Sequence, residues 1–340
     1  MKKILPTSVP LIGCYPQHSF YMSIISEKKE CLPWIFSNYS NIFIDNNGFC
    51  DFFVKTPEYV LYPWFQGSQR ICRDFLLSNK NDFIEFIREN IISDYYIWLY
   101  IDEFYLPCSS EFGKNHFVHS IMISGFDDLN KTFKIHGYYN KSKYSAKNID
   151  YNDLKFSFYN VNAEIDFKSY IHLIKYNENY NLENFVYNTT LFKQQLICHY
   201  NSIFLPLLNQ EDAYNSSISE NLTTGLNVYD KLIDFLNLGS LNVDITYDHR
   251  PLYVLLEHKK FMLLKLEYLK SQAFLIFSDD IFKKYELLKN SIEKQLVLYI
   301  KCSLTKNEEI MERIIKALKV IKNDEKDILE LMLKELDNIQ

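Results

Sequence analysis

The sequence predicts an α+β protein in which a sheet-containing N-terminal part precedes a helical C-terminal part. Up to about residue 165, short segments with the alternation and the β-branched and aromatic content of strands are mixed with amphipathic segments. From about residue 180, apolar residues recur at the spacing of helices. The chain of 340 residues is long enough for two domains of about 150 residues each. We therefore predict domains at residues 1–165 and 175–340, the first with an antiparallel sheet and the second all helical.

The N-terminal part contains both kinds of element. An amphipathic helix is expected directly after Cys14, where the chain reads "PQHSFYMSIISEK". Two short strands, "SNIFID" and "GFCDFFV", flank the turn residues Asn46, Asn47 and Gly48 and predict a hairpin. The other expected elements are a helix over 80–91, strands over 95–106, 116–128 and 131–139, and a strand with a short helix over 144–160.

The C-terminal part is read as a series of helices joined by loops. The polar segment 209–225 is expected to be one of these loops. A helix over 248–269 has a clear start, because Asp248 or His249 can cap it and Pro251 suits its first turn. The remaining helices are expected within 181–202, 225–239, 280–302 and 307–340.

Composition limits the classes of protein that fit. The net charge of −6 argues against a nucleic-acid-binding protein, which usually carries a basic patch. The seven cysteines include no CxxC pair and are odd in number, so neither a disulfide framework nor a zinc ribbon is indicated. No apolar stretch has the length of a signal peptide or of the ~20 residues that span a membrane. We expect a cytoplasmic protein with free cysteines and no membrane association.

Cys14 is the candidate nucleophile. A thiol attacks a carbonyl as the thiolate, which a helix N-terminus and a nearby imidazole both favour. Cys14 lies just before Pro16, a residue suited to the first turn of a helix. His119, at the start of an apolar strand, is the first candidate for the base, and His116 is the second. His18 lies one helical turn after Cys14. The alternative is that Cys14 is a buried small hydrophobic residue and that these histidines are structural.

Three segments together resemble a known family. They are "GCYPQHSFYMSI", "IWLYIDEFYLP" and "HFVHSIMISGFDDLNKTFKIHGYY". They resemble the papain-like fold of the double-glycine leader peptidases and, more closely, the N-terminal domain of the butirosin-biosynthesis protein H family. In that family a histidine is followed by an apolar strand and then Gly-aromatic-Asp, which His119 and Gly125-Phe126-Asp127 match here. A helical domain after a papain-like domain also fits the layout of that family.

The resemblance implies cysteine-dependent acyl transfer, or cleavage of a thioester or an amide, in the assembly of a bacterial peptide-type natural product. Cys14 would be acylated and His119 would be the base. The peptidases carry an Asp on the strand after the histidine, and at that place this chain has Asn140, which we expect to orient the imidazole. Ser8 stands where the peptidases have a glutamine that stabilises the oxyanion. The implied partners are an acyl or peptidyl carrier protein bearing a phosphopantetheine thioester, or a peptide.

Three further residues are candidates for binding the substrate. They are Gln17 in the helix after Cys14, His116, and Arg250 at the start of the helix over 248–269, where a guanidinium can bind an anion. A solvated helix face is the alternative for Arg250. Asp102 and Glu103 are expected to point to opposite faces of a strand, and so not to form one site.

Other expectations concern cofactors and alternative functions. We expect no cofactor and no metal, because His116 and His119 are three apart on a strand and point to opposite faces. One alternative function is a catalytically inactive papain-like module that binds a biosynthetic enzyme or a peptide. Another is a helical interaction protein in which Cys14 belongs to the core.

Overall fold

The protein consists of two compact units, which differ from the predicted domains in the segment 32–55 and in the position of the border. The structure, a computed structural model, describes residues 1–53, 62–65, 69–78, 82–140, 143–162, 166–180, 187–204, 221–241 and 248–338. The first unit comprises Met1–Cys31 and Thr56–Asn184, and the second comprises Leu32–Lys55 and Phe185–Gln340. The border predicted at residues 165–175 thus falls nearer 185. The segment Leu32–Lys55 joins the helical unit because its strands pair and pack there.

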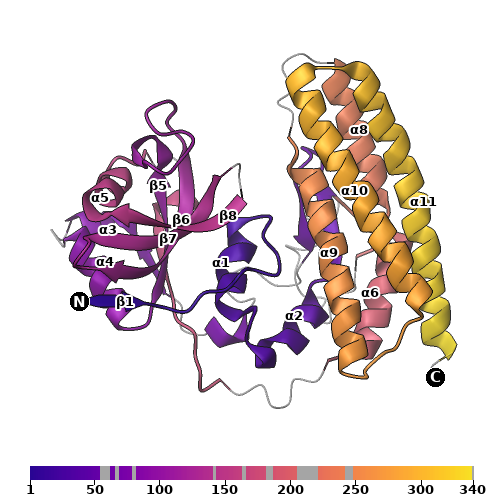
Figure 1. The fold of residues 1–340 in the computed structure, drawn as a ribbon, viewed down its shortest axis with the longest axis horizontal. Helices are drawn as coiled ribbons and strands as arrows, with labels where there is room; N and C mark the ends of the chain where they lie inside the picture. The colour runs from indigo at the N-terminus through magenta and orange to yellow at the C-terminus, as the bar shows by residue number, and fades with distance from the viewer. Residues whose placement is uncertain are drawn as a thin grey trace. The chain divides into compact units, whose positions relative to one another are not determined.

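The first unit is built on an antiparallel sheet (Figure 1). Its described strands run in the order β4-β9-β5-β6-β7-β8, and β1 pairs with the far end of β6. Every neighbouring pair in this sheet is antiparallel. The strands are β1 (Lys2–Ile4), β4 (Gln69–Cys72), β5 (Tyr96–Asp102), β6 (Val118–Asp127), β7 (Thr132–Asn140), β8 (Lys143–Asp150) and β9 (Tyr170–Ile174). The strands predicted over 116–128 and 131–139 are confirmed. The strand predicted over 95–106 ends at Asp102 and is followed by a 3-10 turn over Glu103–Tyr105. Strands β1, β4 and β9 were not predicted.

Helices cover both faces of this sheet. On one face, Phe20 and Tyr21 of α1 pack edge-on against Trp98 of β5, with ring centroids 5.5 and 6.0 Å apart. Figure 1 shows α4 and α5 on the other face, where Phe83 of α4 and Phe158 of α5 stack with ring centroids 4.5 Å apart. The helices of this unit are α1 (Pro16–Ile25), α3 (Arg73–Ser78), α4 (Phe83–Ile92) and α5 (Tyr151–Tyr159), with 3-10 turns η1 (Lys29–Cys31), η2 (Pro63–Phe65), η3 (Glu103–Tyr105) and η4 (Asp166–Ser169).

The Gly-Phe-Asp stretch that ends β6 has structural roles. A Cβ on Gly125 would lie 2.7 Å from the carbonyl oxygen of Lys3, so glycine lets β1 pair closely with β6. Phe126 is buried in the core. Asp127 accepts hydrogen bonds from the backbone N–H of the following turn and from Lys2, and the Lys2 bond lowers the pKa of Asp127 to about 2.

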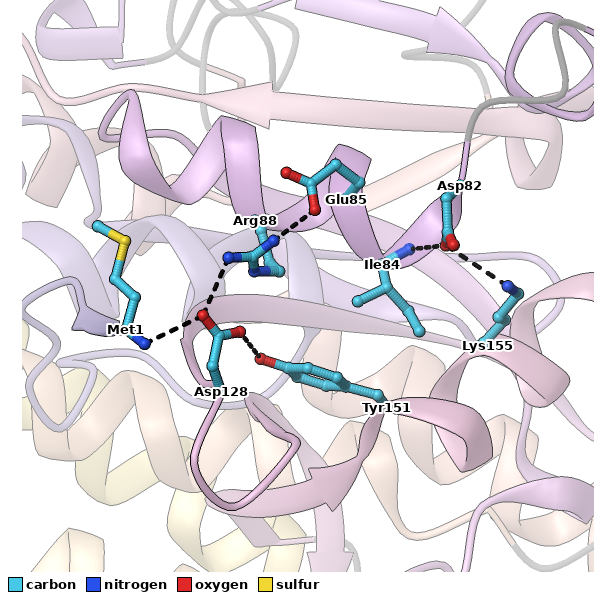
Figure 2. A network of polar contacts seen from close by, with 8 residues as sticks. All are labelled: Met1, Asp82, Ile84, Glu85, Arg88, Asp128, Tyr151 and Lys155. Carbon is cyan, nitrogen blue, oxygen red and sulfur yellow. Dashed lines mark hydrogen bonds and ion pairs between the residues drawn. The ribbon is translucent and has the colours of Figure 1, made fainter.

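A polar network joins the same turn to two helices (Figure 2). The Asp128 carboxylate binds the N-terminal ammonium of Met1 at 3.2 Å, Arg88 of α4 at 2.9 Å and the Tyr151 hydroxyl of α5 at 2.9 Å. At the start of α4, Asp82 accepts the backbone N–H of Ile84 as an N-cap. This network fixes α4 and α5 against the end of β6, away from the start of that strand.

The second unit is a helical bundle with a small sheet. Its elements are α2 (Leu32–Asn38), β2 (Asn41–Asp45), β3 (Cys50–Phe53), α6 (Thr189–Asn201), β10 (Leu222–Thr224), α8 (Asn227–Leu241), α9 (Arg250–Ser271), α10 (Asp279–Thr305) and α11 (Glu308–Asn338). The predicted hairpin is confirmed, with Gly48 at φ +85° in its turn. The predicted helices are confirmed as α6 and α8–α11, and Figure 1 shows α9, α10 and α11 as long neighbouring helices.

The prediction of a loop over 209–225 is wrong for its last part. Residues 222–224 form β10, which pairs antiparallel with β2. The preceding residues to 220 lie outside the described part of the chain. Within the helices that the structure describes, none combines the length and the apolar character needed to cross a membrane.

A buried carboxylate organises the core of the second unit. Glu325 of α11 is fully buried and accepts hydrogen bonds from Lys259 of α9, from Tyr229 of α8 at 2.6 Å and from His199 of α6 at 3.1 Å. Burial alone would raise the pKa of Glu325, but these partners, above all the Lys259 ammonium, hold it well below its usual range. Four helices therefore meet at one ionised group.

The network continues toward the hairpin segment. Lys259 also contacts Nδ1 of His258 at 2.9 Å, and Nε2 of His258 donates to the backbone carbonyl of Ser40 at 2.7 Å. Lys265, fully buried on the same helix, donates to the carbonyl of Tyr39 at 2.8 Å and to the Ser40 hydroxyl. These bonds attach α9 to the backbone that leads into β2, which explains why this early segment belongs to the second unit.

The Lys259→Met substitution should therefore lower the free energy of unfolding by ~3–5 kcal/mol at pH 7, because it leaves the Glu325 charge buried without its cation. The double variant Lys259→Met/Glu325→Gln should be more stable than Lys259→Met, since the amide is uncharged, its oxygen can accept from His199 and its NH2 group can donate to the Tyr229 hydroxyl. Urea denaturation followed by circular dichroism measures both. Lys284→Met, which breaks the exposed Asp280–Lys284 pair, is the control and should cost less than ~1 kcal/mol. A double variant no more stable than Lys259→Met would contradict this account.

Candidate functional site

Cys14 lies at the N-terminal end of α1. The helix begins at Pro16 after an N-cap, Tyr15, whose backbone is extended and whose carbonyl accepts from the N–H of His18 and Ser19. The predicted helix after Cys14, with proline in its first turn, is confirmed. The Cys14 side chain is 9% exposed. The N–H groups of a first helical turn give this end a partial positive charge, which favours a thiolate over a thiol.

An imidazole lies beside this thiol. The Cys14 sulfur and a ring nitrogen of His18 are within 4.8 Å of each other. The four-residue spacing explains this, because residues four apart lie on one side of a helix. His18 is buried in α1, so the ring is held at this position by the packing of the helix. His18 is thus the histidine that the structure brings directly to Cys14.

Tyr138 of β7 connects the Cys14 segment with the sheet. Its hydroxyl lies 3.0 Å from the carbonyl oxygen of Gly13 and 2.9 Å from the hydroxyl of Ser19. The centroid of its ring is 6.1 Å from that of His119. Strands β6 and β7 pair from Met122 and His136 to the turn that joins them. His119 and Tyr138 lie on the other side of the Met122–His136 pair, where β6 and β7 are no longer paired with each other. The backbone next to Cys14 and the His119 ring therefore meet the same tyrosine.

A buried carboxylate holds His119. Nδ1 of His119 is 2.9 Å from Oε1 of Glu103, and the other carboxylate oxygen accepts from the Ser109 hydroxyl. The Glu103 side chain is buried, whereas His119 is partly exposed. Because a carboxylate accepts hydrogen bonds, the proton of the neutral ring is on Nδ1, and the lone pair is on Nε2. This tautomer suits a general base, and the carboxylate stabilises the ring when it takes up a proton.

The structure places Glu103 at Nδ1 of His119, the position for which Asn140 was predicted. The Asn140 side chain lies outside the described residues, but Nδ1 of His119 already has its partner. Asp102 and Glu103 were expected to point to opposite faces of one strand, but in the structure both are buried and each contacts a histidine. The reason is that β5 ends at Asp102 and η3 begins at Glu103, so strand alternation does not apply between them.

His116 forms a second pair of the same kind. Its Nδ1 lies 2.7 Å from Asp102, and its ring stacks on Phe104 with centroids 4.3 Å apart. The His116 side chain is 64% exposed. Asp102 also accepts the backbone N–H of Phe104 and Phe117, and therefore fixes the turn that leads into β6. His116 remains a candidate for substrate contact at the start of this strand.

The two other predicted binding residues lie in different units. Gln17 is in the first turn of α1, three residues after Cys14. Arg250 begins α9 in the second unit, where its guanidinium binds the Asp248 carboxylate at 2.7 Å. The positive charge of Arg250 is thus compensated, which weakens the case for an anion-binding role. His249 is the N-cap of α9, and the Asp248 carboxylate accepts the backbone N–H of Arg250 at 2.9 Å.

His136 of β7 is a buried structural histidine. Its Nε2 lies 2.8 Å from the Ser124 hydroxyl, and its ring stacks near Tyr144. Burial, together with the nearby positive charge of Lys134, lowers the pKa of His136 to about 4. The ring is therefore neutral at pH 7 and helps to pack the sheet face under α1.

Comparisons with known proteins leave the family open. The sequence matches no protein-family model and no curated protein.

The low pKa of His136 predicts a pH dependence of stability. Between pH 6.5 and 4, His136 is neutral in the folded chain but protonated in the unfolded chain, where its pKa is near 6.5. Stability from this residue is therefore complete above pH 6.5 and is lost as the pH falls toward 4, by up to ~1.4 kcal/mol per pH unit. In the His136→Gln variant, the free energy of unfolding should fall less steeply over this range. Urea denaturation from pH 7.5 to 4, followed by tryptophan fluorescence, tests this. Curves that stay parallel to the wild type below pH 6.5 would refute it.

Proposed function

We propose that this protein is a cysteine-dependent acyltransferase or hydrolase in which Cys14 carries the acyl group. The observation that carries the proposal is the Tyr138 side chain, which contacts the backbone beside Cys14 and the ring of His119. Two further features support it: the position of Cys14 at a helix start and the Glu103 carboxylate on His119. A thiol, an imidazole and a buried acid are the parts that nucleophilic acyl transfer requires.

The proposed reaction has two steps. His119 takes the thiol proton at Nε2, and the Cys14 sulfur attacks the carbonyl carbon of a thioester or amide, whose π electrons move to the oxygen. The tetrahedral intermediate then collapses, the bond to the leaving thiol or amine breaks, and His119 returns the proton to that group. In the second step an amine or water attacks the acyl-Cys14 carbonyl with the same proton transfers. The products are an amide or a carboxylic acid, and the thiol is regenerated.

The substrate class follows from the resemblance. A family linked to the assembly of peptide-type natural products suggests an acyl or peptidyl thioester on the phosphopantetheine arm of a carrier protein. A peptide substrate is the second possibility within the same chemistry. Thioesters suit Cys14 because the attacking and departing groups are both thiols, so the first step is nearly balanced in energy.

Purified protein incubated with an acyl-loaded carrier protein should gain the mass of the acyl group on Cys14, as measured by intact-mass spectrometry and peptide mapping. A synthetic N-acetylcysteamine thioester serves as a carrier-free donor. Cys14→Ala should abolish the adduct, and Cys302→Ala, which removes a buried thiol of the second unit, is the control that should retain it. If no adduct forms with either donor and Cys14 reacts with iodoacetamide no faster than the other cysteines, the protein is better explained as a binding module.

The roles of the two imidazoles can be separated by substitution. His119→Gln should slow acylation of Cys14 by ~10²–10⁴-fold because the general base is lost. Glu103→Gln should slow it less, because the ring keeps a hydrogen-bond partner but loses the carboxylate that stabilises it while it carries the proton. His172→Gln is the control, because His172 is a histidine of the same sheet that stacks on Trp98 and has no part in the proposed reaction. If His18→Gln abolishes acylation and His119→Gln does not, the base is His18.

A further inference from the structure

We infer that Tyr138 is a positioning residue that aims the backbone N–H of Cys14 at the oxyanion of the acyl substrate. This inference rests on the proposed function and explains where a donor comes from in a chain that has Ser8 in place of the glutamine. The starting observation is the bond between the Tyr138 hydroxyl and the Gly13 carbonyl at 3.0 Å. The bonded carbonyl belongs to the same peptide group as the N–H of the nucleophile.

The hydrogen bond from Tyr138 to the Gly13 carbonyl also orients the N–H of Cys14, because both groups belong to one peptide. The peptide group between Gly13 and Cys14 is planar, and in the trans form its C=O and N–H point in opposite directions. Fixing the carbonyl toward β7 therefore fixes the Cys14 N–H toward the opposite side. The N–H of the nucleophile residue is a common donor for the oxygen that becomes negative during acyl transfer. A donor helps most when it is already oriented before the reaction.

The hydroxyl of Tyr138 is itself held in place. A carbonyl oxygen can only accept, so the single proton of this hydroxyl goes to Gly13. The Ser19 hydroxyl, 2.9 Å away on the fully buried side of α1, provides the second contact. Glycine at position 13 offers many backbone conformations, so an external bond is an effective way to select one of them. Tyr138 thus connects the orientation of this peptide both to the sheet and to the helix.

The chemistry suggests a test in which two reactions of the same thiol are compared. Acylation by a thioester develops an oxyanion, and alkylation by iodoacetamide does not. Tyr138→Phe should therefore lower the maximal rate of Cys14 acylation by ~10–100-fold, with a smaller change in the thioester concentration for half-maximal rate. The rate of alkylation at the same pH should change less than ~3-fold, because it depends on the thiolate rather than on the peptide orientation.

Tyr139→Phe is the matched control. Tyr139 is the next residue of β7, it is buried, and among the described residues its hydroxyl has no hydrogen-bond partner. Removing that hydroxyl should leave both reactions unchanged. Ser19→Ala is a second variant, which keeps the Tyr138–Gly13 bond but removes its support, and it should slow acylation by an intermediate factor. Melting curves by circular dichroism establish that each variant is folded.

The outcomes separate the two proposals. If the wild type is acylated and Tyr138→Phe and Ser19→Ala are acylated at the same rate, Tyr138 does not position the peptide and the inference is wrong. If Tyr138→Phe slows alkylation as much as acylation, the tyrosine acts on the thiol itself and the inference is also wrong. If the wild type is not acylated at all, the proposed function fails and the inference fails with it.

Discussion

A carboxylate removed from water must find donors that replace its hydration, and this requirement shapes both units. In the second unit, Glu325 draws partners from α6, α8 and α9, so the packing of these helices around α11 depends on it. In the first unit, Glu103 is partnered by Ser109 and His119, which fixes the segment between β5 and β6. Glu325 is enclosed by several donors and stabilises a core. Glu103 binds the partly exposed ring of His119, and so it can serve chemistry as well as structure.

Local sequence patterns predicted the elements whose signals are complete within one segment. Alternation identified β5, β6 and β7, helical periodicity identified α6 and α8–α11, and Asn-Asn-Gly identified the hairpin of β2 and β3. The missed strands β1, β4, β9 and β10 have three to five residues, too few to show a period. Their strand character comes from partners far along the chain. Gly125 illustrates this, because the need for a glycine there arises only when Lys3 lies beside it.

The candidate site was predictable in its residue types but not in its pairings. Cys14 and His119 were predicted at a helix start and at a strand start, and the structure places them there. Glu103 was passed over because adjacent residues on a strand point to opposite faces, a rule that holds only while the strand continues. The β5–β6 register, which pairs Asp102 with Val118 and Ile101 with His119, brings the acidic pair to the two histidines. Such a register depends on the whole sheet, and the sequence around Asp102 does not contain it.

His18 and His119 are held by different parts of the first unit, and each is therefore suited to a different task in the proposed reaction. His18 is on the same helix as Cys14 and close to its sulfur, so it moves with the nucleophile and can stabilise a thiolate. His119 is on the sheet, is partly exposed, and has a carboxylate on Nδ1. A group that must deliver a proton to a departing thiol or amine has to face the substrate, and has to be stabilised while it is charged. These two demands favour the His119–Glu103 pair over the buried ring of His18. In the proposed reaction, the alignment of Cys14 with His119 then depends on Tyr138, which contacts both the backbone beside Cys14 and the His119 ring.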